Sequence, residues 1–402
     1  MSLFSNIPLE PKDPIFISND KFNNSKAEHK MNLTFGVLME PGNEPNLYQF
    51  KCVSKAQDII SKENLDHEYP PLTGLPDYNM AIQNLFFDKD SRVVKESRIM
   101  TVQGITGGAA LTIGADLLSK LATKSIYLSN KTWSCYQGLF QKLEIKYYPY
   151  YDEKTKAIDF ENMSLFFSKL EKGSVVSFII NSHNPTGLDL NLEQWGIIGK
   201  LCATNKIFVF FDIPYAGYST GSFQTDITPV RLFESFGVEM FIAYSTEKNF
   251  GMYSDNCGAF MAILNKPKAI SALKSHLIVC CRTLNSFPSL YPARIIIKIL
   301  NTPELKELWE SELKSISDDL KNKRQLVLKE FEHLNIPINN YVNQQGLYLF
   351  LDINQKQVDY LGDKYNVFVV PGGRVSISCI SSKNVKVFAE AVKDTINNKD
   401  LI

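Results

Sequence analysis

Short apolar runs alternate with helix-like stretches from about residue 98 of this chain. Runs rich in β-branched and aromatic residues predict strands at residues 98–102, 125–129, 175–180, 207–212, 240–245 and 257–264. Helical spacing between them predicts helices that include residues 107–122, 192–204 and 267–279. Continuous apolar strands that alternate with helices indicate a mostly parallel sheet covered on both faces. Because ligands bind such sheets at the carboxyl ends of the strands, polar residues that follow the strands are the first candidates for chemistry.

The two ends of the chain have a different pattern. The first 15 residues contain prolines and no period, which predicts an extended arm that orders against another surface. A strand at 31–38 and helices at 50–62 and 75–87 are expected next. Residues 303–334 predict a long charged helix, and strands at 347–351, 367–370 and 375–380 precede a last helix from residue 382. This C-terminal α+β segment is expected to form a smaller second domain.

Composition narrows the classes of partner. With 402 residues, the chain is too long for one ordinary core. Its 43 basic and 43 acidic residues cancel, which argues against nucleic acid or an anionic membrane as the main partner. The seven cysteines show no CxxC or metal-ligand spacing, so we expect reduced cytoplasmic thiols and no metal site. The sequence has no apolar run of about 18 residues and no signal- or transit-peptide pattern at its N-terminus.

Lys248 and Asp212 stand where apolar strands are expected to end. Lys248 follows Ser245 and Thr246 in a polar loop between two strands, and a surface lysine is the simpler interpretation. The functional alternative is a lysine whose amine is made neutral by desolvation and attacks a carbonyl. Asp212 closes a very apolar strand, where a carboxylate is costly unless it meets a cation or donors. A protonated pyridine nitrogen would be such a partner, and a helix cap or turn is the alternative.

Other candidates follow other strands. Residues 106–108 (Thr-Gly-Gly) form a small turn before a helix, which either receives a phosphate or simply packs tightly. Asn184 lies in an Asn-Pro-Thr-Gly segment, which forms an ordinary turn or reaches into a site. Arg282 and Arg374 interrupt apolar or glycine-rich stretches and could bind carboxylates through paired hydrogen bonds, although surface arginines are common.

The order of these features resembles the fold-type I pyridoxal-phosphate enzymes, and within them the aspartate aminotransferases. The resemblance rests on HNPTG (183–187), FFDIPYAGY (210–218), YSTEKNFGMY (244–253) and GGRVSIS (372–378), and it extends over nearly the whole chain. It implies an α/β architecture with a large cofactor-binding domain, residues 46–312, whose mostly parallel sheet is flanked by helices. A smaller α+β domain would be built from both chain ends, residues 15–45 and 313–402, and an arm of residues 1–14 would contact a partner subunit.

The resemblance implies pyridoxal 5′-phosphate as cofactor and gives each candidate a role. Lys248 would hold the cofactor covalently and move the proton between the substrate Cα and C4′, and Asp212 would face the pyridinium nitrogen. The other implied cofactor contacts are Tyr215 and Asn184 at the phenolic oxygen, Trp133 on the ring face, Thr106, Gly107, Gly108 and Ser245 at the phosphate, and Tyr69 at the partner's phosphate. The implied substrate contacts are Arg374 at the α-carboxylate, Arg282 at the distal carboxylate across the dimer interface, Gly36, Trp133 and Asn184.

The activity implied is transamination between L-aspartate and 2-oxoglutarate, giving oxaloacetate and L-glutamate by a ping-pong route through an aminated cofactor. A cytoplasmic homodimer with shared sites would carry it out. An aromatic or broad-range aminotransferase is an alternative, and a non-catalytic homologue that serves as an interaction subunit is another.

Four positions depart from the family pattern. Asn256 stands where the family has an arginine on the cofactor phosphate, and losing that contact could cost about 1.5–3 kcal/mol of cofactor binding. Tyr136 replaces a histidine behind Asp212, which alters the surroundings of the ring nitrogen. Phe287 replaces an asparagine near the distal carboxylate, and an additional glycine precedes Arg374.

Overall fold

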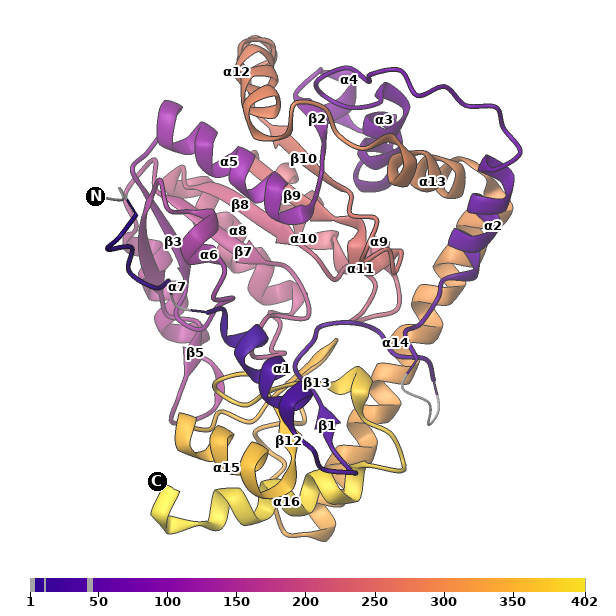
Figure 1. Cartoon of the computed structure of the whole chain (residues 1–402). Coiled ribbons are helices and arrows are strands. Elements are labelled where there is room, and N and C mark those ends of the chain that lie inside the picture. Colours follow the sequence, from indigo (N-terminus) through magenta and orange to yellow (C-terminus); the bar gives the residue numbers. More distant parts are fainter. Residues whose placement is uncertain (1–3, 11, 42–45, 402) are drawn as a thin grey trace.

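A central sheet of seven strands organises the larger body of the molecule (Figure 1). The structure is a computed structural model that describes residues 4–10, 12–41 and 46–401. In spatial order the strands are β2 (Ile99–Gly104), β10 (Gly258–Ile263), β9 (Met240–Ser245), β8 (Phe208–Ile213), β7 (Val175–Ile179), β3 (Ser125–Ser129) and β4 (Glu144–Tyr148). β10 is antiparallel to both of its neighbours, and the other pairings are parallel. The predicted α/β fold with a mostly parallel sheet is confirmed.

Helices cover both faces of this sheet, which explains why its strands are continuously apolar. Along β8, Phe210 belongs to one buried cluster and its neighbours Val209 and Phe211 to another, as the alternation of side chains along a strand requires. The cluster around Phe210 lies under α5 (Gly107–Leu121) and α12 (Pro267–Asn285). The opposite cluster lies under α8 (Leu192–Asn205), α10 (Thr228–Ser235) and α7 (Phe160–Lys169).

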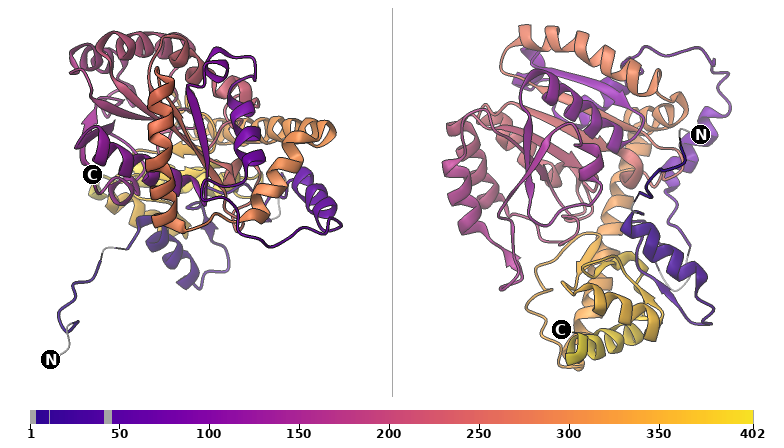
Figure 2. Two further views of the ribbon diagram at one scale, coloured as in Figure 1. Left: turned by 90° about the horizontal axis from the view of Figure 1, so that it is seen from above. Right: turned by 60° about the vertical axis from the view of Figure 1, so that its left-hand side comes forward.

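A smaller body is built from the two chain ends (Figures 1 and 2). β1 (Met31–Asn32) pairs in parallel with β12 (Val367–Phe368), so residues more than 330 positions apart lie side by side. β11 (Tyr348–Phe350) pairs with β13 (Arg374–Ser376) in antiparallel fashion. Around these strands pack α1 (Pro14–Asn24), α15 (Gln355–Tyr365) and α16 (Val385–Asn397), and the 31-residue α14 (Pro303–His333) joins this body to the sheet.

Several boundaries differ from the sequence prediction. The strand expected at 31–38 ends at Asn32, and the chain after it lines a cavity instead of a ladder. The polar loop expected around Lys248 is a one-turn helix, α11 (Thr246–Asn249). Part of the expected arm, residues 1–3 and 11, lies outside the described residues.

The remaining elements are α2 (Lys51–Ile60), α3 (Pro76–Phe86), α4 (Arg92–Lys95), α6 (Tyr136–Leu139), β5 (Tyr151–Asp152), β6 (Ala157–Ile158), α9 (Phe223–Asp226), α13 (Leu290–Asn301) and two 3-10 turns, Ile377–Cys379 and Lys399–Leu401.

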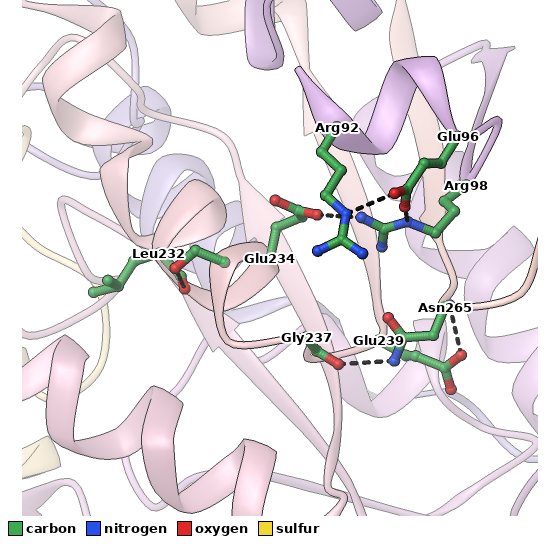
Figure 3. Close-up of polar contacts among 9 residues, drawn as sticks. Arg92, Glu96, Arg98, Leu232, Glu234, Gly237, Glu239 and Asn265 are labelled. Carbon is green, nitrogen blue, oxygen red and sulfur yellow. Dashed lines mark hydrogen bonds and ion pairs between the residues drawn. The ribbon is translucent and has the colours of Figure 1, made fainter.

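A cluster of charges ties elements together at the amino ends of the parallel strands (Figure 3). The nearly buried Arg98, just before β2, pairs with Glu96 at 2.7 Å and with Glu234 of α10 at 2.6 Å. Glu96 also pairs with the exposed Arg92 at 2.6 Å. These ion pairs hold α4, β2 and α10 together at the amino ends of the parallel strands, on the side opposite to their carboxyl ends.

No helix among the described residues is long and apolar enough to cross a membrane.

Candidate active site

A cavity of about 270 Å³ opens at the carboxyl ends of the parallel strands. Four segments that follow strands contribute to it: the start of α5 after β2, the loop after β3, the loop after β7 and the residues around the ends of β8 and β9. The segment of residues 13–37 and the smaller body close its other side. Of the residues expected to form the site, those that line this cavity are Gly36, Gly107, Gly108, Trp133, Asn184, Asp212, Tyr215, Ser245, Lys248 and Arg374.

Lys248 lies on α11, directly after the buried strand β9, and its amine faces the cavity. Burial lowers the pKa of Lys248, and the charge of Arg374 acts in the same direction, whereas Glu247 raises it. The Nζ atom lies 4.8 Å from the centroid of the Tyr253 ring and forms no ion pair with any described residue. This setting favours the neutral amine, which is the nucleophilic form.

Asp212 is 4% exposed and accepts a hydrogen bond of 2.6 Å from the Tyr136 hydroxyl. Burial raises the pKa of Asp212 to about 7, and the hydrogen bond from Tyr136 opposes that rise. A cationic ligand atom beside the carboxylate would restore its ionised form. The tyrosine that replaces the family's histidine is therefore a direct partner of the carboxylate.

Arg374 is a buried arginine with spare hydrogen-bonding capacity. Its guanidinium donates to Asn184 Oδ1 at 3.1 Å and to the Thr34 carbonyl at 2.6 Å, and it lies 4.4 Å from the centroid of the Tyr348 ring. Its Nε has no partner among the described residues, although the side chain is 3% exposed. Arg374 also lines the cavity, so a carboxylate that enters it would pair with this guanidinium.

Gly36 and Tyr348 form the wall beside this arginine. A Cβ at Gly36 would lie 2.1 Å from the Tyr348 hydroxyl, so only glycine allows this close approach. The Tyr348 hydroxyl is in turn 2.9 Å from the Tyr215 hydroxyl. The contacts fix the position of Tyr215 within the cavity.

The start of α5 meets the end of β9 at another side of the cavity. Thr106 caps the helix by accepting a 2.8 Å hydrogen bond from the Ala109 N–H. A Cβ at Gly107 would lie 2.6 Å from the Ser245 Cβ, so a small residue is required where the two segments cross. This side presents the free N–H groups of a helix N-terminus, which suit an anion.

Three expected site residues do not line the cavity of this chain. Thr106 acts through its cap, as above, and Tyr69 and Arg282 lie on the exposed surface. Both of these contact Phe287: the Tyr69 ring stacks on it at 4.6 Å, and the Arg282 guanidinium lies 5.2 Å from its centroid.

Sequence reasoning missed several residues that line the cavity. They are Asp13, Ile15, Phe16, Phe35, Val37, Leu111, Cys135, Ile179, Pro214, Glu247 and Tyr348. Tyr348 lies in the apolar run LYLF, which is typical of a buried core strand, and Glu247 lies in a polar segment that is typical of the surface. Neither position carries a signal of its own in the sequence.

The fold and the cavity together define an α/β protein in which a lysine, a buried acid and a buried arginine line one cavity. Burial lowers the pKa of the lysine, the acid would be ionised beside a cationic atom, and the arginine would pair with a carboxylate. The ring and aldehyde of pyridoxal 5′-phosphate and a carboxylate-bearing substrate supply these partners. Among the described residues no cluster of side chains could hold a metal ion.

Comparison with known proteins identifies the family. A model of the family described as aminotransferase class I and II matches residues 28–392. Cytoplasmic aspartate aminotransferase of Dictyostelium discoideum is 34% identical over 403 residues, which cover 99% of this chain and 91% of that protein. The solved aspartate aminotransferase from Saccharomyces cerevisiae cytoplasm has a TM-score of 0.93 at 31% identity and covers 98% of each chain. The aromatic-amino-acid aminotransferase from Burkholderia pseudomallei, described as covalently bound to pyridoxal phosphate, has a TM-score of 0.93 at 29% identity and covers 99% of this chain and 100% of its own.

The chain belongs to the class I and II aminotransferase family. The predictions of family, enzyme class and pyridoxal-phosphate dependence are confirmed. Amino acids and 2-oxo acids are accordingly its class of substrate.

Proposed function

We propose that this aminotransferase transfers the amino group of L-aspartate to 2-oxoglutarate, giving oxaloacetate and L-glutamate by a ping-pong route. The observation that carries the proposal is Arg374, a buried arginine that lines the same cavity as Lys248 and Asp212. Relatives named aspartate aminotransferase that match nearly the whole chain support this choice of substrate.

The residues around the cavity would divide the chemistry as follows. Bound pyridoxal phosphate supplies an electron sink for the substrate Cα. Asp212 would hold a proton on the ring nitrogen, and Tyr215 and Asn184 would donate hydrogen bonds to the phenolic oxygen. Lys248 would hold the aldehyde carbon C4′ and, once displaced by the incoming amino group, carry the proton from Cα to C4′.

Substrate orientation would come from the arginines and from the ring face. Arg374 would bind the α-carboxylate, and Trp133 would stack against the cofactor ring. Gly36 would let the substrate pass close to the chain, and Asn184 would bridge Arg374 and the cofactor. Arg282 would bind the distal carboxylate, and an unpaired arginine there would penalise short neutral substrates.

The phosphate end of the cofactor would be received by the start of α5. The backbone at Gly107 and Gly108, with Thr106 as the cap and Ser245 opposite, offers N–H and hydroxyl donors. No arginine or lysine other than Arg374 and Lys248 lines the cavity among the described residues. The residues that line the cavity therefore suit the ring and the aldehyde of the cofactor. Among the described residues of the lining, no cationic side chain is placed to bind its phosphate.

A homodimer in the cytoplasm is the proposed setting. Tyr69 and Arg282 are exposed and share Phe287 as a contact, which supports a role for both in the partner's site. The arm of residues 1–14 would contact the partner, and the large domain of residues 46–312 would carry the cofactor. The cytoplasmic aspartate aminotransferases of Dictyostelium discoideum and Caenorhabditis elegans support this location, although a mitochondrial Dictyostelium discoideum relative matches almost equally well.

The direct test is transamination from aspartate to 2-oxoglutarate, with and without added pyridoxal phosphate. The proposal expects oxaloacetate to form with added cofactor. It also expects a visible absorption band from bound cofactor that Lys248→Ala removes. Absence of the band at high cofactor concentration would favour a non-catalytic interaction subunit.

An aromatic or broad-range aminotransferase is the second candidate. The cavity wall formed by Ile15, Phe16, Phe35 and Trp133 is apolar, and Arg282 lies outside the cavity of its own chain. The broad-specificity aminotransferase of Leishmania mexicana, with a TM-score of 0.92 and 30% identity over 98% of both chains, is a neighbour of this kind. A kcat/KM for phenylalanine that equals or exceeds the value for aspartate would establish this alternative.

A further inference from the structure

A carboxylate of the chain itself faces the place where the cofactor phosphate would bind. Glu247, directly before Lys248, lines the cavity together with Gly107, Gly108 and Ser245. The backbone N–H of Gly107 lies near enough to the Glu247 carboxylate to lower its pKa. Gly107 is the first residue of α5, so this N–H belongs to the positive end of the helix dipole.

The negative charge of the Glu247 carboxylate has few positive groups near it. Burial raises the pKa of Glu247, and only the nearby Lys248 charge and the Gly107 N–H lower it. The charge of Asp212 repels that of Glu247 across the cavity. No described residue forms an ion pair with Glu247, and Asn256, which holds the place of the family's arginine, is exposed and does not line the cavity.

A second side chain at the same place is poised for an oxyanion. Ser245 is 6% exposed, and its hydroxyl makes no hydrogen bond to any described residue. It lines the cavity beside the start of α5. The helix N-terminus and this hydroxyl thus form an anion-binding corner, and the Glu247 carboxylate lines the same cavity.

We propose that Glu247 determines cofactor specificity by competing with the cofactor phosphate for the N-terminus of α5. A phosphate ester carries a charge of about −1.5 to −2 at pH 7, so it and Glu247 would repel each other at the same helix end. The chain would therefore discriminate weakly between pyridoxal 5′-phosphate and pyridoxal, which lacks the phosphate. This inference rests on the proposed function, because it concerns the same cofactor site.

The test measures the dissociation constants of pyridoxal 5′-phosphate and of pyridoxal for the full-length, cofactor-free protein, from the absorption of the bound compound. Glu247→Gln removes the charge and keeps the shape. Because any effect through the pKa of Lys248 is common to both compounds, we expect this substitution to tighten pyridoxal phosphate relative to pyridoxal by about tenfold to a hundredfold. Glu247→Ser should act in the same direction. Asp255→Asn, which removes an exposed negative charge from the neighbouring loop, is the matched control and should change neither constant.

Two results would overturn the inference. One is a wild-type preference for the phosphorylated compound of about a thousandfold, which a competing carboxylate does not allow. The other is an unchanged ratio of the two constants in both Glu247 variants. Failure of the proposed function would look different: neither compound would then give an absorption change that Lys248→Ala abolishes, because both share the ring and the aldehyde.

Discussion

At the scale of single residues, Asp212 couples the site to protein stability. Burial raises the pKa of Asp212 to about 7 in the folded protein, whereas an unfolded aspartate titrates at about 3.9. The folded state therefore binds more protons between these values, and the stability contributed by this group is full below about pH 4 and is lost as pH rises through about 7. We expect Asp212→Asn to stabilise the cofactor-free protein by on the order of 3 kcal/mol at pH 8, and by less than half of that at pH 5.

Denaturant unfolding of cofactor-free wild type and Asp212→Asn between pH 5 and pH 8 measures this difference. Asp58→Asn removes an exposed acid whose carboxylate forms no hydrogen bond or ion pair with a described residue, and it should leave stability unchanged throughout. A gain from Asp212→Asn that did not vary with pH would show that ionisation of the buried acid is not its cause.

Arg374 supports a second prediction at this scale. Lysine cannot reproduce the fork by which the Arg374 guanidinium reaches both Asn184 and the Thr34 carbonyl. We expect Arg374→Lys to lower kcat/KM for aspartate by about a hundredfold or more, because the α-carboxylate loses a paired contact. Cofactor binding, followed by visible absorption, should be nearly unchanged.

Arg231→Lys is the matched control for this substitution. Arg231 is partly exposed, donates hydrogen bonds to Gln224 and to the Phe86 carbonyl, and does not line the cavity, so its replacement should leave both measurements at the wild-type level. A full loss of cofactor absorption in Arg374→Lys would mean that the arginine supports the fold of the site and does not select the substrate.

The residues that sequence reasoning found share a physical property. Asp212 lies near the end of an apolar strand and Lys248 three residues beyond another, so the pattern itself makes these charged groups conspicuous. Tyr348 and Glu247 carry no such contrast: one belongs to an apolar run and the other to a polar segment. Only the folded chain brings Tyr348 to Tyr215 and Glu247 to the start of α5.

At the scale of elements, the crossing of α5 and β9 depends on one glycine. A Cβ at Gly107 would meet the Ser245 Cβ at 2.6 Å, whereas a Cβ at Gly108 would find its nearest atom at 3.5 Å. We expect Gly107→Ala to destabilise the protein by about 1–3 kcal/mol, since either the strand end or the helix start must move. Gly108→Ala adds the same methyl group one residue later and should be neutral or slightly stabilising, because alanine favours the helix.

Denaturant unfolding of the two glycine variants at one pH checks this pair. The comparison isolates the contact with Ser245, since both substitutions are Gly→Ala in the first turn of the same helix. Equal destabilisation by both would show that the backbone of the turn, and not the crossing with β9, requires glycine.

Elements were predictable where both of their faces are buried. The strands β3 and β9 have the predicted bounds, because continuous apolar runs flanked by turns have few alternatives. β4 was missed because it is the edge strand, where Glu144 and Lys146 break the apolar pattern. The strand expected at 31–38 stops at Asn32 because the following residues pack against the cavity, and no local pattern records that.

At the scale of the whole molecule, the exposed position of Arg282 leads to the last prediction. Lys248 lines the cavity of its own chain and Arg282 does not, so the proposed function requires that a complete site takes Arg282 from a second copy. In a mixed population of Lys248→Ala and Arg282→Ala subunits, half of the dimers are hybrids, and each hybrid holds one complete site. We expect such a mixture to recover about a quarter of wild-type aspartate transamination, although each variant alone is nearly inactive.

A control mixture separates shared sites from simple stabilisation by a partner. Lys248→Ala mixed with Asp212→Asn leaves every site defective, because both residues line the same cavity of one chain, and it should recover nothing. Near-normal activity of Arg282→Ala alone would place Arg282 outside the catalytic assembly and favour the aromatic or broad-range alternative, in which the distal carboxylate has no dedicated arginine. Recovery in neither mixture, with both variants inactive alone, would place Arg282 in the site of its own chain. Recovery in the first mixture alone requires both the dimer and the crossing of its interface by Arg282, since no other arrangement supplies an intact lysine and an intact arginine to one site.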